Sequence, residues 1–132
     1  MMMTGTTPFP ALDKDPRLPH VAERALKQIA KTALGAEQSV NWSHSESLPE
    51  TIEQLISDGY TVGALEQTDD ATNIANIKPP QNWALIVGHE VDGIDTETLE
   101  LVDQHWQIPM LGQKQSFNVT IAAAVAIWQL HQ

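Results

Sequence analysis

Apolar positions in this sequence recur at helical spacing in some segments and form short continuous runs in others. The first helical segment covers His20–Leu34, and Gly35 supplies its C-terminal stop. Ser47 with Glu50 three residues later forms a capping box, which predicts a second helix that ends at Gly59. Helices therefore alternate along the chain with the short apolar runs.

Those short apolar runs predict strands. They cover Gln38–Trp42, Tyr60–Leu65, Trp83–Val87 and Gln104–Ile108, and Met1–Met3 has the pattern of the end of a further strand. The run Trp83–Val87 contains no polar position, which predicts a strand covered on both faces. Prolines predict irregular chain at Phe9–Pro19, and a polar cluster predicts a loop at Ser43–Ser47. Asp69–Ile77 is expected to contain a helical turn, which Pro79-Pro80 ends. The alternation predicts an α/β fold with a mostly parallel sheet flanked by helices.

The last third of the chain places two glycine loops after two of the predicted strands. Gly88–Gly93 forms the first loop, and Gly112 lies in the second. Between them, Asp95 or Thr96 caps a short predicted helix. The final helix, Asn118–Leu130, is apolar almost all round, which predicts burial on more than one side. In an open α/β sheet ligands bind where such loops follow the strands, so we expect a binding site here.

Composition narrows the classes of function. The 132 residues match one domain of ordinary size. The chain has no cysteine, which excludes disulfides and cysteine-bound zinc and suits a cytoplasmic protein. No apolar run approaches the roughly 20 residues that span a bilayer, and the first residues lack the features of a signal peptide. We therefore expect no membrane partner. The five histidines show no metal-ligand spacing, so we also expect no metal.

The formal net charge of −10 argues against a broad electrostatic grip on nucleic acid. Five of the seven basic residues nevertheless lie in the first quarter of the chain. Arg24, Lys27 and Lys31 share the polar face of the first predicted helix. Such a face is more often solvated than bound, and RNA contact is the alternative.

Several short motifs fall in a specific order in the last third. They are Gly88-His89-Glu90, Gly93, Ile108-Pro109-Met110, Gly112 and Ser116-Phe117-Asn118-Val119. In this combination the sequence resembles the SpoU-type RNA ribose 2′-O-methyltransferases of the SPOUT, or α/β-knot, superfamily. The upstream segments Thr4–Pro8, Lys31–Glu37 and Gly59–Thr68 resemble the tRNA (guanosine-2′-O) branch, so the resemblance covers essentially the whole chain.

The resemblance implies a function, a cofactor and a set of site residues. The function is transfer of a methyl group from S-adenosyl-L-methionine to a ribose hydroxyl of tRNA or rRNA. The residues implied as cofactor contacts are Gly88, Ile108, Phe117 and, more weakly, Thr68; those implied for catalysis are Glu90, Ser116 and Asn118. The resemblance also implies a single domain, residues 1–132, whose cofactor-binding half covers about residues 60–132 and forms a C-terminal trefoil knot. It further implies a homodimer, for which the final helix is the candidate interface.

The sequence departs from the family pattern at three places. His89 replaces the usual Asn, and Phe117 replaces the usual Leu. The family's first motif, an Asn followed by the Arg that assists the hydroxyl, is absent, so we expect an N-terminally shortened chain. The alternative function is therefore an inactive remnant that binds cofactor, RNA or a partner subunit without turnover. A third interpretation is an unrelated nucleotide-binding α/β domain.

The individual site residues also have simpler interpretations. Gly88 and Gly93 suit ordinary turns, and Glu90 suits a solvated loop. Ser116 and Asn118 are natural N-caps for the final helix, a role compatible with shaping a pocket. The segment Gly112–Ser116 lacks the pattern of a phosphate-binding loop.

Overall fold

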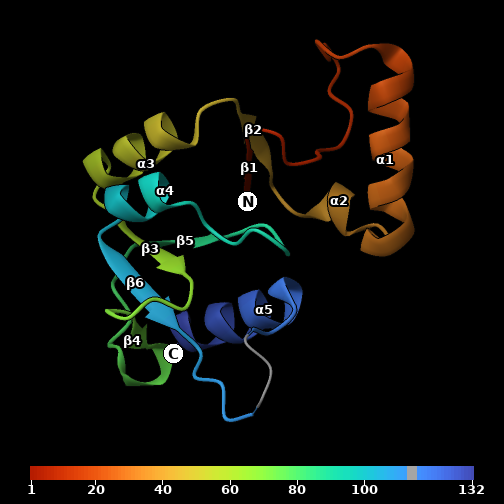
Figure 1. Ribbon diagram of the computed structural model, residues 1–132. Helices are drawn as coiled ribbons and strands as arrows, with labels where there is room; N and C mark the ends of the chain where they lie inside the picture. The colour runs from red at the N-terminus through yellow and green to blue at the C-terminus, as the bar shows by residue number, and fades with distance from the viewer. Residues whose placement is uncertain (113–115) are drawn as a thin grey trace. The chain divides into compact units, whose positions relative to one another are not determined.

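The computed structural model describes residues 1–112 and 116–132 (Figure 1). The chain divides into two compact units, Met1–Leu48 and Pro49–Gln132. Lys114, together with its two neighbours, lies outside the described residues. Within the described part, no helix has both the length and the apolar character needed to cross a membrane.

The first unit pairs two short strands and carries the basic helix. β1 (Met2–Thr4) lies parallel to β2 (Ser43–Ser45). α1 (Pro19–Ala33) ends at Leu34, which takes a positive φ of 51° and is followed by Gly35 with a φ of 96°. The segment Phe9–Pro19 is irregular, as predicted. The guanidinium of Arg17 lies 3.7 Å from the Phe9 ring centroid and donates hydrogen bonds to both carboxylate oxygens of Asp15.

The strand predicted at Gln38–Trp42 is wrong. Its first residues belong to α2 (Ala36–Ser39), a helical turn that begins where the Gly35 amide donates to the Glu37 carboxylate. The strand β2 instead occupies the Ser43–Ser45 segment that was predicted to be a loop. Pairing with β1 satisfies its backbone, so tertiary context overrides the weak strand preference of Ser-His-Ser.

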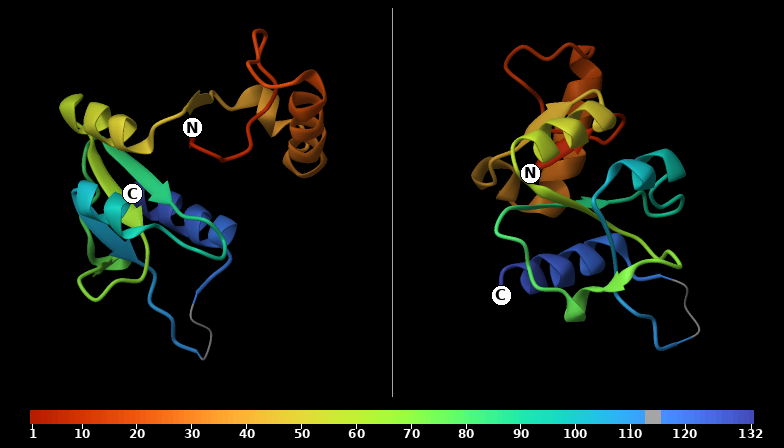
Figure 2. Two further views of the ribbon diagram at one scale, coloured as in Figure 1. Left: turned by 45° about the horizontal axis from the view of Figure 1, so that its top comes forward. Right: turned by 90° about the vertical axis from the view of Figure 1, so that its left-hand side faces the viewer.

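The second unit is built on a parallel sheet with the strand order β4-β6-β3-β5. The strands are β3 (Thr61–Leu65), β4 (Thr72–Asn73), β5 (Trp83–Val87) and β6 (Gln104–Gln107), and every pairing is parallel. α5 (Val119–Leu130) lies on one side of the sheet, with α3 (Leu48–Ser57) and α4 (Thr96–Leu101) on the other (Figures 1 and 2). This confirms the prediction of a parallel sheet flanked by helices.

A buried tryptophan organises the core between the sheet and α5. The Trp106 side chain is 1% exposed and clusters with Ile74, Ala126 and Leu130. Gly63, on the neighbouring strand β3, leaves room for its ring, since a Cβ there would lie 2.3 Å from a ring carbon. Trp106 is thus the largest fully buried side chain in the close-packed contact between the sheet and α5.

The two helices next to the glycine loops begin at side-chain caps. Asp95 accepts from the Thr98 amide at 2.8 Å and caps α4. Asn118 accepts from the Thr120 amide at 2.9 Å and caps α5. Both caps confirm predictions from the sequence, and the second fixes where the chain turns from the loop into the helix.

Two further expectations are corrected. β5 is the edge strand of the sheet and is half-buried, so its apolar run does not mark a strand covered on both faces. Within this chain α5 buries Ala126 and Leu130 but leaves Ile121 and Trp128 exposed. The helical turn predicted within Asp69–Ile77 is present as a 3-10 turn, Ile74–Asn76, and the short strand β4 precedes it.

Candidate functional site

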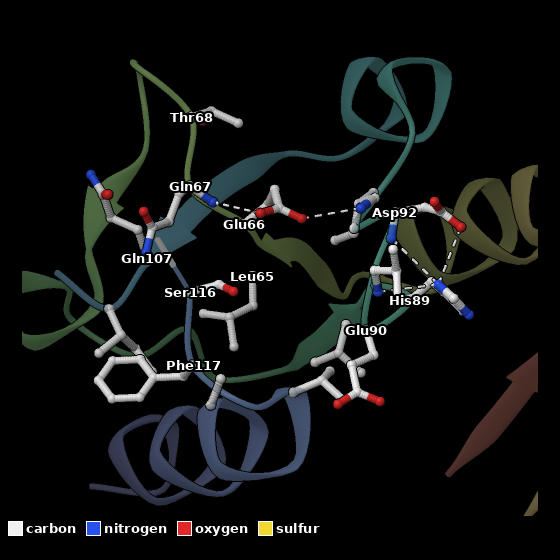
Figure 3. A pocket seen from close by; sticks show the side chains of 18 of the residues that line it. Leu65, Glu66, Gln67, Thr68, His89, Glu90, Asp92, Gln107, Ser116 and Phe117 are labelled. Atoms are coloured by element: carbon white, nitrogen blue, oxygen red, sulfur yellow. Dashed lines mark hydrogen bonds and ion pairs between the residues drawn. The ribbon is translucent and has the colours of Figure 1, made fainter. Parts of the chain in front are cut away.

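A cleft of about 460 Å³ lies where β3, β5 and β6 end and α5 begins. Its walls come from the exit of β3, the glycine loop after β5, the end of β6 and the turn into α5 (Figure 3). The lining residues are Leu65–Thr68, Val87–Ile94, Leu99, Gln107, Ile108, Ser116, Phe117, Val119 and Ala122. The carboxyl ends of neighbouring parallel strands thus converge on one concave site.

Six of the seven residues that the sequence singled out line this cleft: Thr68, Gly88, Glu90, Ile108, Ser116 and Phe117. They come from four separate segments of the chain. Phe117 is 44% exposed, and Glu90 and Ser116 are also exposed, so these side chains are accessible from solvent. Asn118 is outside the lining and acts as the N-cap of α5. Their positions in the cleft do not test their roles in cofactor binding or catalysis, which stay predictions.

The glycine loop Gly88–Gly93 is closed by its own backbone. His89 and Gly93 exchange two amide-to-carbonyl hydrogen bonds, each of 3.0 Å. A Cβ on Gly88 would lie 2.4 Å from the carbonyl carbon of Gly93, so a side chain cannot fit without moving the loop. Gly93 has a positive φ of 68°, a conformation that favours glycine. Both glycines are therefore required by the geometry of the loop.

The same motifs match a known family. The pattern of the SpoU rRNA methylase family covers residues 18–128. This chain belongs to that family. Among its relatives, a tRNA (guanosine(18)-2′-O)-methyltransferase of Borreliella burgdorferi is 30% identical over 113 residues, which are 84% of this chain and 52% of the relative. The Escherichia coli tRNA (guanosine(18)-2′-O)-methyltransferase is 28% identical over 104 residues, 79% of this chain and 45% of the relative.

Solved structures support the family's fold. An AdoMet-bound rRNA methyltransferase from Sinorhizobium meliloti superposes with a TM-score of 0.75 at 15% identity, covering 98% of this chain and 44% of that one. A TrmH/SpoU tRNA-modifying enzyme from A. aeolicus gives a TM-score of 0.68 at 18% identity, covering 98% and 58%. This SpoU-family chain spans about half the length of the curated relatives it matches.

Sequence reasoning missed Glu66, which joins two walls of the cleft in this SpoU-family chain. Its Oε2 accepts from the Ile94 amide at 3.1 Å, and its Oε1 accepts from the Gln67 amide at 3.0 Å (Figure 3). A Cβ on Gly93 would lie 2.5 Å from Oε2, so the carboxylate packs directly on the glycine loop. A carboxylate directly after a strand was visible in the sequence, but its partner across the cleft, the Ile94 amide, lies 28 residues away.

We expect Glu66→Ala to weaken binding of S-adenosylhomocysteine about three- to tenfold, because the Ile94 amide loses its acceptor and the loop loses a charge-assisted hydrogen bond. Glu66→Gln keeps an oxygen that can accept from the same amide, so it should restore most of the affinity. Isothermal titration calorimetry measures both. Equal affinities for wild type and the alanine variant would contradict this role.

The charge on the cleft is acidic. Glu66, Glu90 and Asp92 contribute carboxylates, and the described lining contains no lysine or arginine. Residues 49–132 carry the entire net charge of −10, since residues 1–48 hold five basic and five acidic side chains. The cleft therefore favours a cationic small molecule over a phosphate.

His89, which replaces the usual Asn, stabilises the tip of the glycine loop. Its Nδ1 accepts from the amides of Val91 at 3.2 Å and Asp92 at 3.4 Å. The Asp92 carboxylate lies 3.2 Å from the same nitrogen. The ring therefore holds its own loop and is positioned as a structural group.

Proposed function

We propose that this chain is the cofactor-binding part of an S-adenosyl-L-methionine-dependent RNA ribose 2′-O-methyltransferase. One observation carries the proposal: six motif residues from four segments meet in one cleft at the carboxyl ends of the strands. The named functions of the tRNA methyltransferase relatives support the RNA substrate, and the AdoMet-bound rRNA methyltransferase supports the cofactor.

The cleft fits this cofactor by its volume, by the open approach to the Gly88 backbone and by its charge. Its volume of about 460 Å³ falls within the range of small-molecule sites. Gly88 has no side chain, so a ligand can approach its backbone closely. The carboxylates of Glu66, Glu90 and Asp92 suit a cationic sulfonium.

S-adenosylmethionine supplies an electrophilic methyl group when it is bound. In this proposal Gly88 and Ile108 contribute main-chain polar groups, and Phe117 contributes an apolar wall. The Thr68 hydroxyl donates its proton to Asp70 and can still accept a hydrogen bond from a ligand. Glu90 and Ser116 are the polar side chains that can accept a hydrogen bond from a ribose hydroxyl and orient it, while Asn118 fixes the turn that presents Ser116 and Phe117. Positioning of this kind supplies much of the rate in a group transfer.

Calorimetric titration with S-adenosylhomocysteine tests the cofactor assignment. Saturable binding of S-adenosylhomocysteine, with no binding of adenosine 5′-monophosphate, is the expected result. Equal binding of both would favour an unrelated mononucleotide site. Transfer of a radiolabelled methyl group to tRNA or rRNA transcripts then tests turnover, with the 2′-O-methylated nucleoside identified by chromatography.

A second candidate function is cofactor binding without turnover. It is favoured by the lack of arginine in the described lining and by the engagement of Arg17, which is held by Asp15 and by the carbonyls of Phe9 and Pro10. RNA contact would then fall to the basic face of α1, which carries Arg24 and Lys31. Binding of S-adenosylhomocysteine without methyl transfer would identify this function.

We further propose that the chain forms a homodimer through α5. On the family resemblance we also propose that the C-terminal part of the chain forms a trefoil knot and that the enzyme is cytoplasmic. Ile121, Val125 and Trp128 lie at i, i+4 and i+7 on α5 and are 56%, 45% and 65% exposed. A row of exposed apolar side chains of this kind marks an interaction surface.

Ile121→Glu is expected to convert the dimer to a monomer, because dimerisation would then bury a charge. Light scattering at micromolar concentration measures the mass. Ile56→Glu on α3, where the side chain is 38% exposed, is the matched control and should leave the dimer intact. A wild-type monomer under these conditions would overturn the dimer proposal.

A further inference from the structure

His105 lies behind the wall of the cleft and contacts two segments that line it. Its Nε2 is 2.9 Å from the Leu99 carbonyl, at the end of α4. Its Nδ1 is 2.8 Å from Oδ2 of Asp70, in the crossover from β3 to β4. The His105 side chain is 20% exposed and that of Asp70 is 69% exposed.

The contact continues from Asp70 to the cleft. The Thr68 hydroxyl donates to Oδ1 of Asp70 at 2.6 Å, and Thr68 lines the cleft beside the exit of β3 (Figure 3). Leu99, the other partner of the histidine, is also a lining residue. One imidazole ring therefore connects two parts of the lining that come from different elements.

We propose that His105 is a positioning residue of the cofactor cleft, holding Thr68 through Asp70 and Leu99 through its carbonyl. This inference rests on the proposed function, because it assigns Thr68 and Leu99 to the wall of a cofactor site. Both acceptors can be satisfied only when both ring nitrogens carry a proton, since a neutral imidazole has one N–H. The charged ring is therefore the form that holds both segments.

The electrostatics agree with this geometry. The hydrogen bond to the Leu99 carbonyl, together with the Asp70 carboxylate, raises the pKa of His105 above its usual value despite partial burial. The hydrogen bond from Thr68, followed by that from His105, lowers the pKa of Asp70. Among the described residues, Asp70 is the charged group at ion-pair distance from the ring. α4 contacts the ring through a carbonyl, and Asp103, before β6, is bound to the Val62 amide.

The sign of the pH dependence follows. The folded pKa of His105 is raised, so the double contact is complete below the ordinary histidine pKa and is lost as the pH rises through the raised value. Asp70, with its lowered pKa, stays ionised over this range. The affinity of the cleft for S-adenosylhomocysteine should therefore fall as the pH rises through the raised pKa of His105.

The test compares Asp70→Ala with Asp69→Ala by calorimetry with S-adenosylhomocysteine. Asp69 is an exposed neighbour outside the lining, so its removal changes the charge equally without touching the network. We expect Asp70→Ala to weaken binding about three- to tenfold and to flatten its pH profile, and Asp69→Ala to stay within about twofold of wild type with the pH profile retained. A further readout is the Thr68 amide resonance, which should titrate together with the His105 ring in wild type and not in Asp70→Ala.

The outcomes separate this inference from the function on which it rests. If wild type binds S-adenosylhomocysteine and the two aspartate variants bind equally well, the positioning role is overturned and the proposed function stands. If wild type does not bind, the proposed function is overturned, and this inference with it. Because Asp70 is exposed, its replacement leaves the core intact. His105→Gln, which removes the titrating ring, should then show the same flattened pH profile as Asp70→Ala.

Discussion

Replacing Gly88 by alanine is expected to reduce the affinity for S-adenosylhomocysteine by more than about tenfold, a loss comparable to that of a well-formed contact. The added Cβ would lie 2.4 Å from the carbonyl carbon of Gly93 and 2.7 Å from the amide nitrogen of Ile94. These are backbone atoms, so no side chain can rotate away to make room. The loop must open, which breaks the paired hydrogen bonds between His89 and Gly93. Calorimetry at a temperature where circular dichroism shows the variant folded measures the effect.

Gly112→Ala is the matched control for this experiment. Among the described residues, a Cβ on Gly112 would have no heavy atom within 4 Å, and the φ of Gly112 is not in the positive range. The same chemical change should therefore leave the affinity within about twofold, as for a surface substitution without special features. A Gly88→Ala variant that binds as tightly as Gly112→Ala would show that the closed geometry of the loop is not needed for the cofactor.

The site positions were predictable from the sequence because they follow a rule that acts locally. A glycine or polar group directly after a parallel strand lies at the carboxyl edge of the sheet, whichever strands are neighbours. Gly88 lies at such a position, directly after β5. Ile108, directly after β6, was implied as a cofactor contact by the family resemblance. Asn118 was predictable for a second local reason, the need of the first amides of α5 for an acceptor. Neither inference required knowledge of the strand order.

The residues that were missed depend on partners far along the chain. Glu66 reaches an amide 28 residues away, and His105 reaches a carboxylate 35 residues away. Nothing in the local pattern distinguishes these side chains from solvated ones. The loop after β5 reaches Glu66 because β3 pairs with β5, and Asp70 reaches His105 because β4 pairs with β6. β5 was misjudged for a related reason. The apolar run of β5 can be read from the sequence, whereas its place at the edge of the sheet depends on the strand order.

The core of the second unit depends on a single large side chain, and Trp106→Ala is expected to destabilise it by about 3–5 kcal/mol. Trp106 is 1% exposed and packs against residues from the 3-10 turn and from α5, so its removal leaves a cavity between the sheet and the helix. Urea unfolding followed by circular dichroism measures the free energy of unfolding. A loss below about 1 kcal/mol, typical of a surface position, would contradict this assignment.

Gly63 provides a sharper test of the same contact. Its Cβ would lie 2.3 to 2.5 Å from three carbons of the Trp106 ring, so Gly63→Ala should cost about 1–3 kcal/mol through overpacking. In the Trp106→Ala background the ring is gone and the added methyl group has space. The cost of Gly63→Ala should then largely disappear, which a double-mutant cycle detects as a coupling energy. An equal cost in both backgrounds would mean that β3 needs glycine for its backbone and not for the tryptophan ring.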